Sequence, residues 1–191
     1  MNPLTHKILA QKLYQELSEV STPQILYRKS LIWGSMRPDF VRESIPHFKS
    51  RGDKQFYKKC GSFINNMNQM NQREFSGELG QIFHYIGDFF CQAHNKKLLV
   101  YNKRLHFLNE IRLQKFIKNI KNNFFDISMR NMHENSRGIN VRKIIESEYR
   151  RFEKDKFSFQ NDLHFAYRVS ALIGRKMIKN YVQRRSRYLA A

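Results

Sequence analysis

The stretch G-Q-I-F-H-Y-I-G-D-F-F-C-Q-A-H (residues 80–94), with H-F-L-N-E at residues 106–110, is the most informative part of the chain. It places His84 and Asp88 four residues apart, then His94, then His106 and Glu110, again four apart. Residues i and i+4 of a helix lie on one face, so each pair can present an imidazole and a carboxylate to one point. Such nitrogen and oxygen donors suit zinc. The stretch therefore predicts helices that carry a metal site.

A plain hydrophobic helix is the alternative interpretation of residues 80–89. Ile82, Phe83 and Ile86 are typical of a core, and a single His among them would more often be a core residue than a ligand. Asp88 favours the metal site, because a carboxylate in an apolar helix is costly to bury unless it is paired or bound to a metal. Cys91 is interpreted as a small core residue rather than as a soft ligand.

The composition predicts an all-α fold. The chain has 191 residues, with only 8 Gly and 4 Pro, and shows no sustained period-two alternation. Its length suits one domain, so we expect a single-domain multi-helix bundle around the metal site, covering residues 1–191. Cys60 and Cys91 are too few for a disulfide framework. With no signal-peptide pattern and no run of about 18–20 apolar residues, the expected location is the cytoplasm, either free or at the periphery of a membrane.

The charge is strongly positive. There are 35 Lys and Arg against 16 Asp and Glu, a formal net charge of +19. A field of this size attracts polyanions, either an anionic membrane surface or nucleic acid. The basic residues are densest between Arg175 and Arg187. This segment is either a solvated helix face or a surface that engages a partner, and the sequence leaves both open.

Local signals predict where the helices begin and end. We expect Thr5 to cap a first helix and Ser76 to cap the helix that bears His84 and Asp88. Irregular turns are expected at residues 33–39 and 46–53. Apolar periodicity predicts the remaining helices at residues 24–32, 54–68, 102–125, 141–154 and 161–188.

Three further candidate ligands lie upstream: His6 in the first helix, Asp39 in G-S-M-R-P-D (residues 34–39) and His47 in P-H-F. The ordered motifs are then an early His, G-S-x-x-P-D, a lone His in the next loop, G-x-x-x-H-Y-x-G-D-x-x-x-x-x-H and H-x-x-x-E. In this series, from His6 to about Glu110, the chain resembles the zinc-dependent phospholipase C family, bacterial all-helical phosphodiesterases with a cluster of zinc ions.

The resemblance implies a role for each of these residues. Two to three Zn²⁺ ions are expected, and the ligands divide among them: His47, His84 and Asp39 for the first, with Asp88 bridging to the third; His94, His106 and Glu110 for the second; His6 for the third. In secreted members the third ion is completed by the amine and carbonyl of an N-terminal Trp. This chain begins with Met1, so the completion of that site is left open. Phe40 matches an aromatic position of the headgroup pocket, or is a core residue.

The implied reaction is hydrolysis of a phosphodiester. Zinc lowers the pKa of a bound water to near neutrality and offsets the charge of the phosphoryl group. Asp39 is the candidate group to orient or deprotonate the water, or is only a ligand. The expected function is a phospholipase C that acts on phospholipids at an anionic membrane surface. A zinc-dependent nuclease or other phosphodiesterase is the alternative. A third interpretation is a basic binding module without enzymatic activity, in which the metal ions only stabilise the fold.

Overall fold

Every regular element in the described part of the chain is a helix, which confirms the all-α prediction. The computed structural model describes residues 1–19, 25–41, 45–95, 102–120, 124–125 and 139–189. The α-helices are α1 (Pro3–Glu19), α2 (Arg28–Met36), α3 (Lys49–Asn66), α4 (Gln72–Phe89), α6 (Lys103–Asn119), α8 (Val141–Phe152) and α9 (Phe159–Leu189). Three short 3₁₀ helices are η1 (Arg37–Asp39), η2 (Met67–Gln69) and η3 (Gln92–His94).

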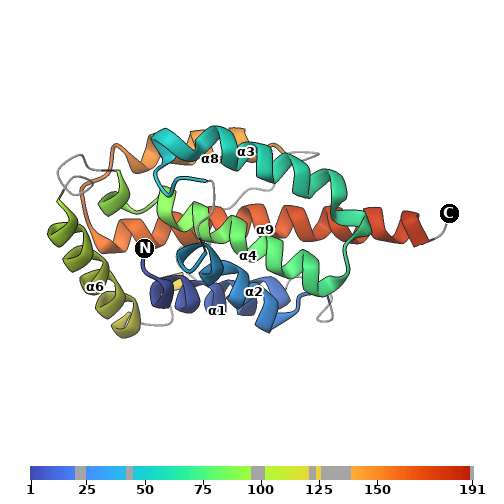
Figure 1. The fold of residues 1–191 in the computed structure, drawn as a ribbon, viewed down its shortest axis with the longest axis horizontal. Helices are drawn as coiled ribbons and strands as arrows, with labels where there is room; N and C mark the ends of the chain where they lie inside the picture. Colours follow the sequence, from blue (N-terminus) through green and yellow to red (C-terminus); the bar gives the residue numbers. More distant parts are fainter. Residues whose placement is uncertain (20–24, 42–44, 96–101, 121–123, 126–138, 190–191) are drawn as a thin grey trace.

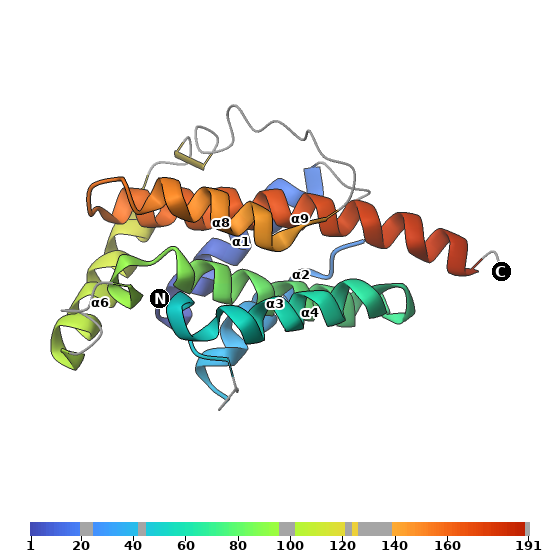
Figure 2. The same ribbon diagram turned by 90° about the horizontal axis from the view of Figure 1, so that it is seen from above.

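Helix α4 is the central element of the fold. Every residue from Leu79 to Phe89 is buried, and α4 contacts α1, α2, α3 and α9. Figures 1 and 2 show it between α2 and α3, with α9 running behind it. A helix that is apolar on all sides is expected to be enclosed in this way. His84 and Asp88 therefore lie at the centre of the molecule rather than on its surface.

The N-terminus of α4 differs from the prediction. Asn71, not Ser76, is the cap: its side chain accepts hydrogen bonds from the backbone N–H groups of Arg73 and Glu74, and the Glu74 side chain accepts one from the Asn71 N–H. This is a reciprocal capping box. The Ser76 hydroxyl instead lies inside the helix, where it donates to the Gln72 carbonyl at 2.6 Å and accepts from the Tyr27 N–H at 2.8 Å.

Glycines allow α2 to pack directly against α4. A Cβ added at Gly80 would lie 2.2 Å from the Leu31 carbonyl oxygen, and one at Gly34 would lie 2.1 Å from the Gly77 carbonyl oxygen. Neither position tolerates a side chain, because both collisions are with backbone. This close approach places the C-terminal end of α2, and η1 after it, over the polar end of α4.

Three other local predictions were wrong. Asn2, not Thr5, caps α1: its side chain accepts from the Thr5 N–H at 3.0 Å and from the Thr5 hydroxyl at 2.9 Å. Residues 33–36, expected in a turn, continue α2. Gly52, expected in a loop, lies within α3, where an added Cβ would be 2.1 Å from the Pro46 carbonyl oxygen. Gly52 thus serves a close backbone approach and not a turn.

The predicted helices of residues 102–125 and 161–188 are present with shifted ends. Helix α6 ends at Asn119, and residues 121–123 lie outside the described part. Helix α9 begins at Phe159, and its C-terminal end lies at the end of the molecule remote from Met1 and α6 (Figures 1 and 2). None of the described helices is both long and apolar enough to span a bilayer.

Candidate metal centre

The structure brings all eight predicted ligands together, although they come from six separate segments. Their ligand atoms form three groups, and within each group the atoms lie within 4.8 Å of one another. The groups are His6, His84 and Asp88; Asp39, His47 and His84; and His94, His106 and Glu110. Cys91 belongs to none of these groups and is buried in the hydrophobic core, as expected.

Asp88 connects the group that contains His6 with the group that contains His47. Its Oδ2 lies 2.6 Å from His47 Nδ1 and 3.3 Å from His84 Nε2, while its Oδ1 lies 3.2 Å from His6 Nε2. Burial alone would raise the pKa of Asp88, but electrostatic interactions with His94 and with the Met1 amine hold that pKa well below its usual range. Asp88 is therefore an ionised carboxylate at the centre of the cluster.

Glu110 contacts both histidines of its own group, His94 and His106. Its Oε1 lies 3.1 Å from His94 Nε2 and 3.3 Å from His106 Nε2. Partial burial would raise the pKa of Glu110, but the hydrogen bonds from the two imidazoles lower it below its usual range. The i, i+4 pairs that the sequence indicated, His84 with Asp88 and His106 with Glu110, thus face the same region from α4 and α6.

Backbone carbonyls orient two of the imidazoles. His84 Nδ1 lies 3.0 Å from the Ser35 carbonyl oxygen, and His106 Nδ1 lies 3.3 Å from the Ala93 carbonyl oxygen. A carbonyl oxygen only accepts, so each Nδ1 donates to it. Each Nε2 then faces a carboxylate of the cluster, Asp88 for His84 and Glu110 for His106, and a backbone acceptor on the other ring nitrogen is the arrangement that metal-ligating histidines show. The sequence contains no signal for these two carbonyls.

The donor set fits zinc. His84 Nε2 and His47 Nδ1 face each other at 3.2 Å, and the buried atoms His6 Nε2 and Asp39 Oδ2 have no hydrogen-bond partner among the described residues. Burial lowers the pKa of His6 to about 3, so its imidazole is neutral, as a ligand must be. Five imidazoles and three carboxylates that converge with free donor atoms are suited to more than one zinc ion, because a structural site needs only four ligands.

The Met1 amine also lies in the cluster, at the site whose completion the sequence analysis left open. It forms an ion pair with Asp88 Oδ1, and its nitrogen is 2.8 Å from His94 Nε2 and 3.5 Å from Glu110 Oε1. The amine thus lies beside Asp88, the carboxylate expected to bridge to the third ion.

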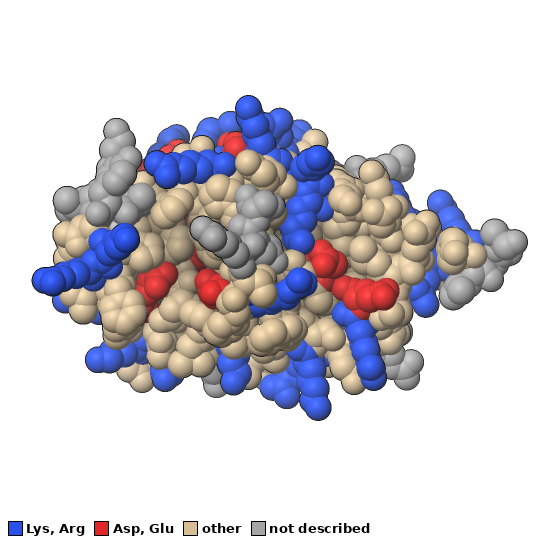
Figure 3. Space-filling view, viewed as in Figure 1, with Lys and Arg blue, Asp and Glu red and all other residues tan. Residues whose placement is uncertain are grey.

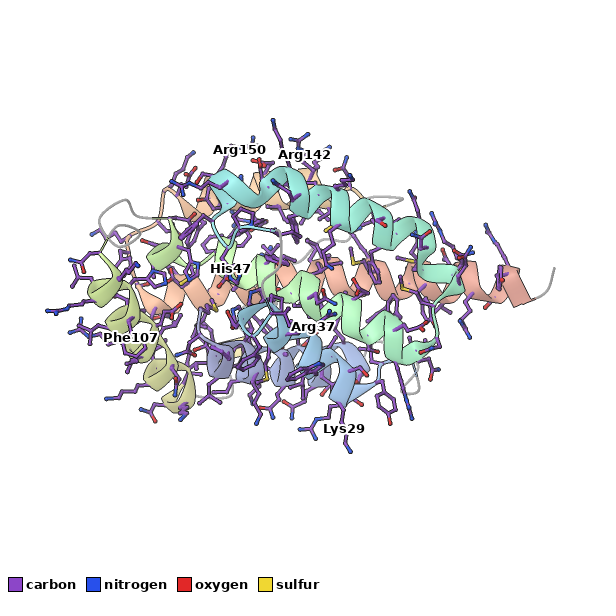
Figure 4. The ribbon with its side chains drawn as sticks, viewed as in Figure 1. Lys29, Arg37, His47, Phe107, Arg142 and Arg150 are labelled. Atoms are coloured by element: carbon purple, nitrogen blue, oxygen red, sulfur yellow. The ribbon has the colours of Figure 1, made fainter. Side chains whose placement is uncertain are left out.

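One face of the cluster opens into a cavity of about 570 Å³. Its polar wall includes Asp39, His47, His106 and Glu110, and its apolar wall includes Pro46 and Phe48. His47 lies near the middle of the view in Figure 4. Phe40 is not part of the lining: it is exposed, and its ring stacks on Trp33 with centroids 6.0 Å apart. A headgroup contact from Phe40 stays a prediction.

Comparisons with known proteins place the chain in one family. Its sequence matches the family described as zinc dependent phospholipase C over residues 5–172. Searches of curated proteins and of solved structures gave no significant match. The matched span covers most of the chain and includes all eight candidate ligands. The protein therefore belongs to the zinc-dependent phospholipase C family.

Proposed function

We propose that the protein is a phospholipase C that hydrolyses phospholipids to diacylglycerol and a phosphorylated headgroup. The observation that supports this most strongly is the convergence of eight ligand-type side chains, five of which line an open cavity. Belonging to the family implies a phosphodiester substrate held in a lipid. The cavity has room for a headgroup phosphate, and its apolar wall suits the glycerol end of a lipid.

The eight side chains would hold two to three zinc ions in the groups described above. Zinc bound there supplies positive charge for the phosphodiester anion and lowers the pKa of water. The chain's own contribution is to hold the donors in place: carbonyls orient His84 and His106, and Asp88 stays ionised between the groups. Because the donors are fixed before substrate arrives, little reorganisation is needed during the reaction.

Asp39 is the proposed proton acceptor. It lines the cavity, and its Oδ2 has no hydrogen-bond partner among the described residues. A carboxylate positioned within hydrogen-bond reach of water can act as a general base. Water would transfer a proton to Asp39 as its oxygen bonds to phosphorus. The bond from phosphorus to the glycerol oxygen then breaks, that oxygen takes up a proton from solvent water to give diacylglycerol, and Asp39 returns its proton to solvent.

One zinc-loaded preparation should be tested on mixed phospholipid vesicles, on a monomeric short-chain phospholipid, and on single-stranded DNA and RNA. The expected result is release of diacylglycerol and phosphorylated headgroup from the lipids, with nucleic acid intact. The Asp39→Asn variant is the control for contaminating enzymes. Cleavage of nucleic acid with both lipids inert would contradict the proposal and favour a nuclease, a use that the net charge of +19 would also serve.

A further inference from the structure

Large hydrophobic side chains are exposed mainly in two places. Nine are exposed among the described residues, and six of these belong to two clusters next to metal ligands. The α2 ridge consists of Trp33, Phe40 and Val41; the α6 ridge consists of Leu105, Phe107 and Leu108. Apolar side chains that gather at the surface, rather than being scattered singly, mark a binding surface.

The α2 ridge contains a stacked aromatic pair, formed by Trp33 of α2 and Phe40 directly after η1. Trp33 is 56% exposed and Phe40 is 59% exposed, and their ring planes are 8° apart. Phe40 directly follows Asp39, which lines the cavity. Trp is enriched where membrane and water meet, because its ring is apolar and its N–H is polar.

The α6 ridge lies on the first turns of α6. Phe107 is 62% exposed and is the neighbour of His106 (Figure 4). Leu105 and Leu108 are three residues apart, so they share one side of the helix. Phe107 projects from another side of the same turns. His106 and Glu110, also from these turns, line the cavity, so the α6 ridge belongs to the helix segment that forms part of the cavity wall.

The two ridges project from the same face. In Figure 2 the C-terminal end of α2 and the first turns of α6 both extend toward the bottom of the view, on either side of Met1. Met1 itself lines the cavity. A flat apolar partner that rested on both ridges would span the region where the cavity opens.

The charge around the ridges matches an anionic partner. Arg37, Lys103 and Arg104 are exposed on η1 and α6, and the only carboxylates in α2, η1 and α6 are Asp39 and Glu110 of the metal centre. Figure 3 shows more Lys and Arg than Asp and Glu side chains on this face, at its margin and also near its middle. Apolar residues bordered by cations are the pattern of proteins that bind at the surface of anionic membranes.

We propose that the α2 and α6 ridges dock the protein on an anionic phospholipid bilayer, with Trp33 and Phe107 entering the interface. This rests on the proposed function, since docking on this face would bring the cavity to its substrate. The basic end of α9 is a different surface at the remote end of the molecule (Figure 1), where Arg184 and Arg185 donate to the carbonyl oxygens of Ile64 and Met70.

Trp33 makes the test direct, because it is the only Trp in the chain. The protein is mixed with vesicles of phosphatidylcholine containing phosphatidylglycerol, and the fluorescence of Trp33 is recorded together with co-sedimentation. The Asp39→Asn variant is measured in parallel so that the lipid is not consumed. Docking by the ridges predicts an emission shift to shorter wavelength and protection from iodide quenching.

Phe107→Ala and Phe157→Ala form a matched pair of variants. Phe157, 45% exposed, lies in the connection between α8 and α9. Figure 2 shows these two helices in the layer away from α2 and the first turns of α6. Phe107→Ala should weaken vesicle binding by about tenfold, since burying a Phe side chain is worth at least one such factor. Phe157→Ala should change it by no more than about twofold. The ratio of vesicle-lipid to monomeric-lipid hydrolysis should fall only in Phe107→Ala.

The failure of docking and the failure of the proposed function are distinguishable. Co-sedimentation without a change in Trp33 emission would overturn the docking surface, whatever the activity. Equal effects of the two Phe variants on vesicle binding would also overturn it. Without lipid, protection of Trp33 from iodide that increases with protein concentration would overturn it too, because it would indicate a second copy of the protein on the ridges. A Trp33 shift with no lipid hydrolysed would support docking and contradict the phospholipase proposal.

Discussion

Replacing Gly80 with Ala would disturb the metal centre without touching a ligand. The added Cβ would lie 2.2 Å from the Leu31 carbonyl oxygen and 2.9 Å from the Ser35 nitrogen, so α2 must move by about 1 Å to restore ordinary contact. The Ser35 carbonyl, now 3.0 Å from His84 Nδ1, would move beyond hydrogen-bonding distance. We expect a loss of about 1–3 kcal/mol in the free energy of unfolding from overpacking. Zinc affinity should fall by about 10–100-fold, the usual effect of losing such an orienting contact.

The assay is a competition titration with a chelator, together with thermal unfolding of the metal-free and zinc-loaded protein. Gly61→Ala is the matched control, because Gly61 is exposed in α3 and an added Cβ there would meet nothing within 4 Å. It should leave zinc affinity unchanged and stabilise α3 by about 0.5–1 kcal/mol. If Gly80→Ala equalled the wild type in both stability and zinc affinity, the close packing of α2 on α4 would not position the site.

Three further predictions concern the site and the surface. Asp39→Asn should lower hydrolysis of monomeric lipid to about a hundredth or less with the fold intact by circular dichroism; a rate above about a tenth would contradict its role as base. His106→Ala should lower the zinc content by about one ion per chain in elemental analysis, because its group of ligands would keep only His94 and Glu110. Changing Arg184, Arg185 and Arg187 to Gln should weaken vesicle binding mainly at low salt, where screening is least, while leaving the emission shift of vesicle-bound protein; an abolished shift would assign docking to α9.

Much of the site was accessible from the sequence because its strongest signals are local. The pairs His84–Asp88 and His106–Glu110 depend only on helical spacing, and both helices formed as expected. The upstream candidates His6, Asp39 and His47 came from the order of motifs in the family, and the structure places all three beside α4.

What the sequence did not indicate depends on contacts between distant segments. The roles of Gly80 and Gly52 come from backbone atoms of other segments, so both residues resemble ordinary turn or helix glycines in the sequence. The carbonyl of Ser35 has no signature at all, because every residue carries one. The cap of α4 was misplaced since Ser76 and Asn71 are both good capping residues, and only the reciprocal bond with Glu74 decides between them.

The central claim is that three groups of side chains form one zinc cluster. The most direct test is an anomalous difference map from crystals of the chelator-free protein, with data collected on both sides of the zinc absorption edge. The account predicts at least two zinc peaks within one cluster, one among Asp39, His47 and His84 and another among His94, His106 and Glu110. A map without a zinc peak at either place, from protein that carries less than one zinc per chain, would contradict it.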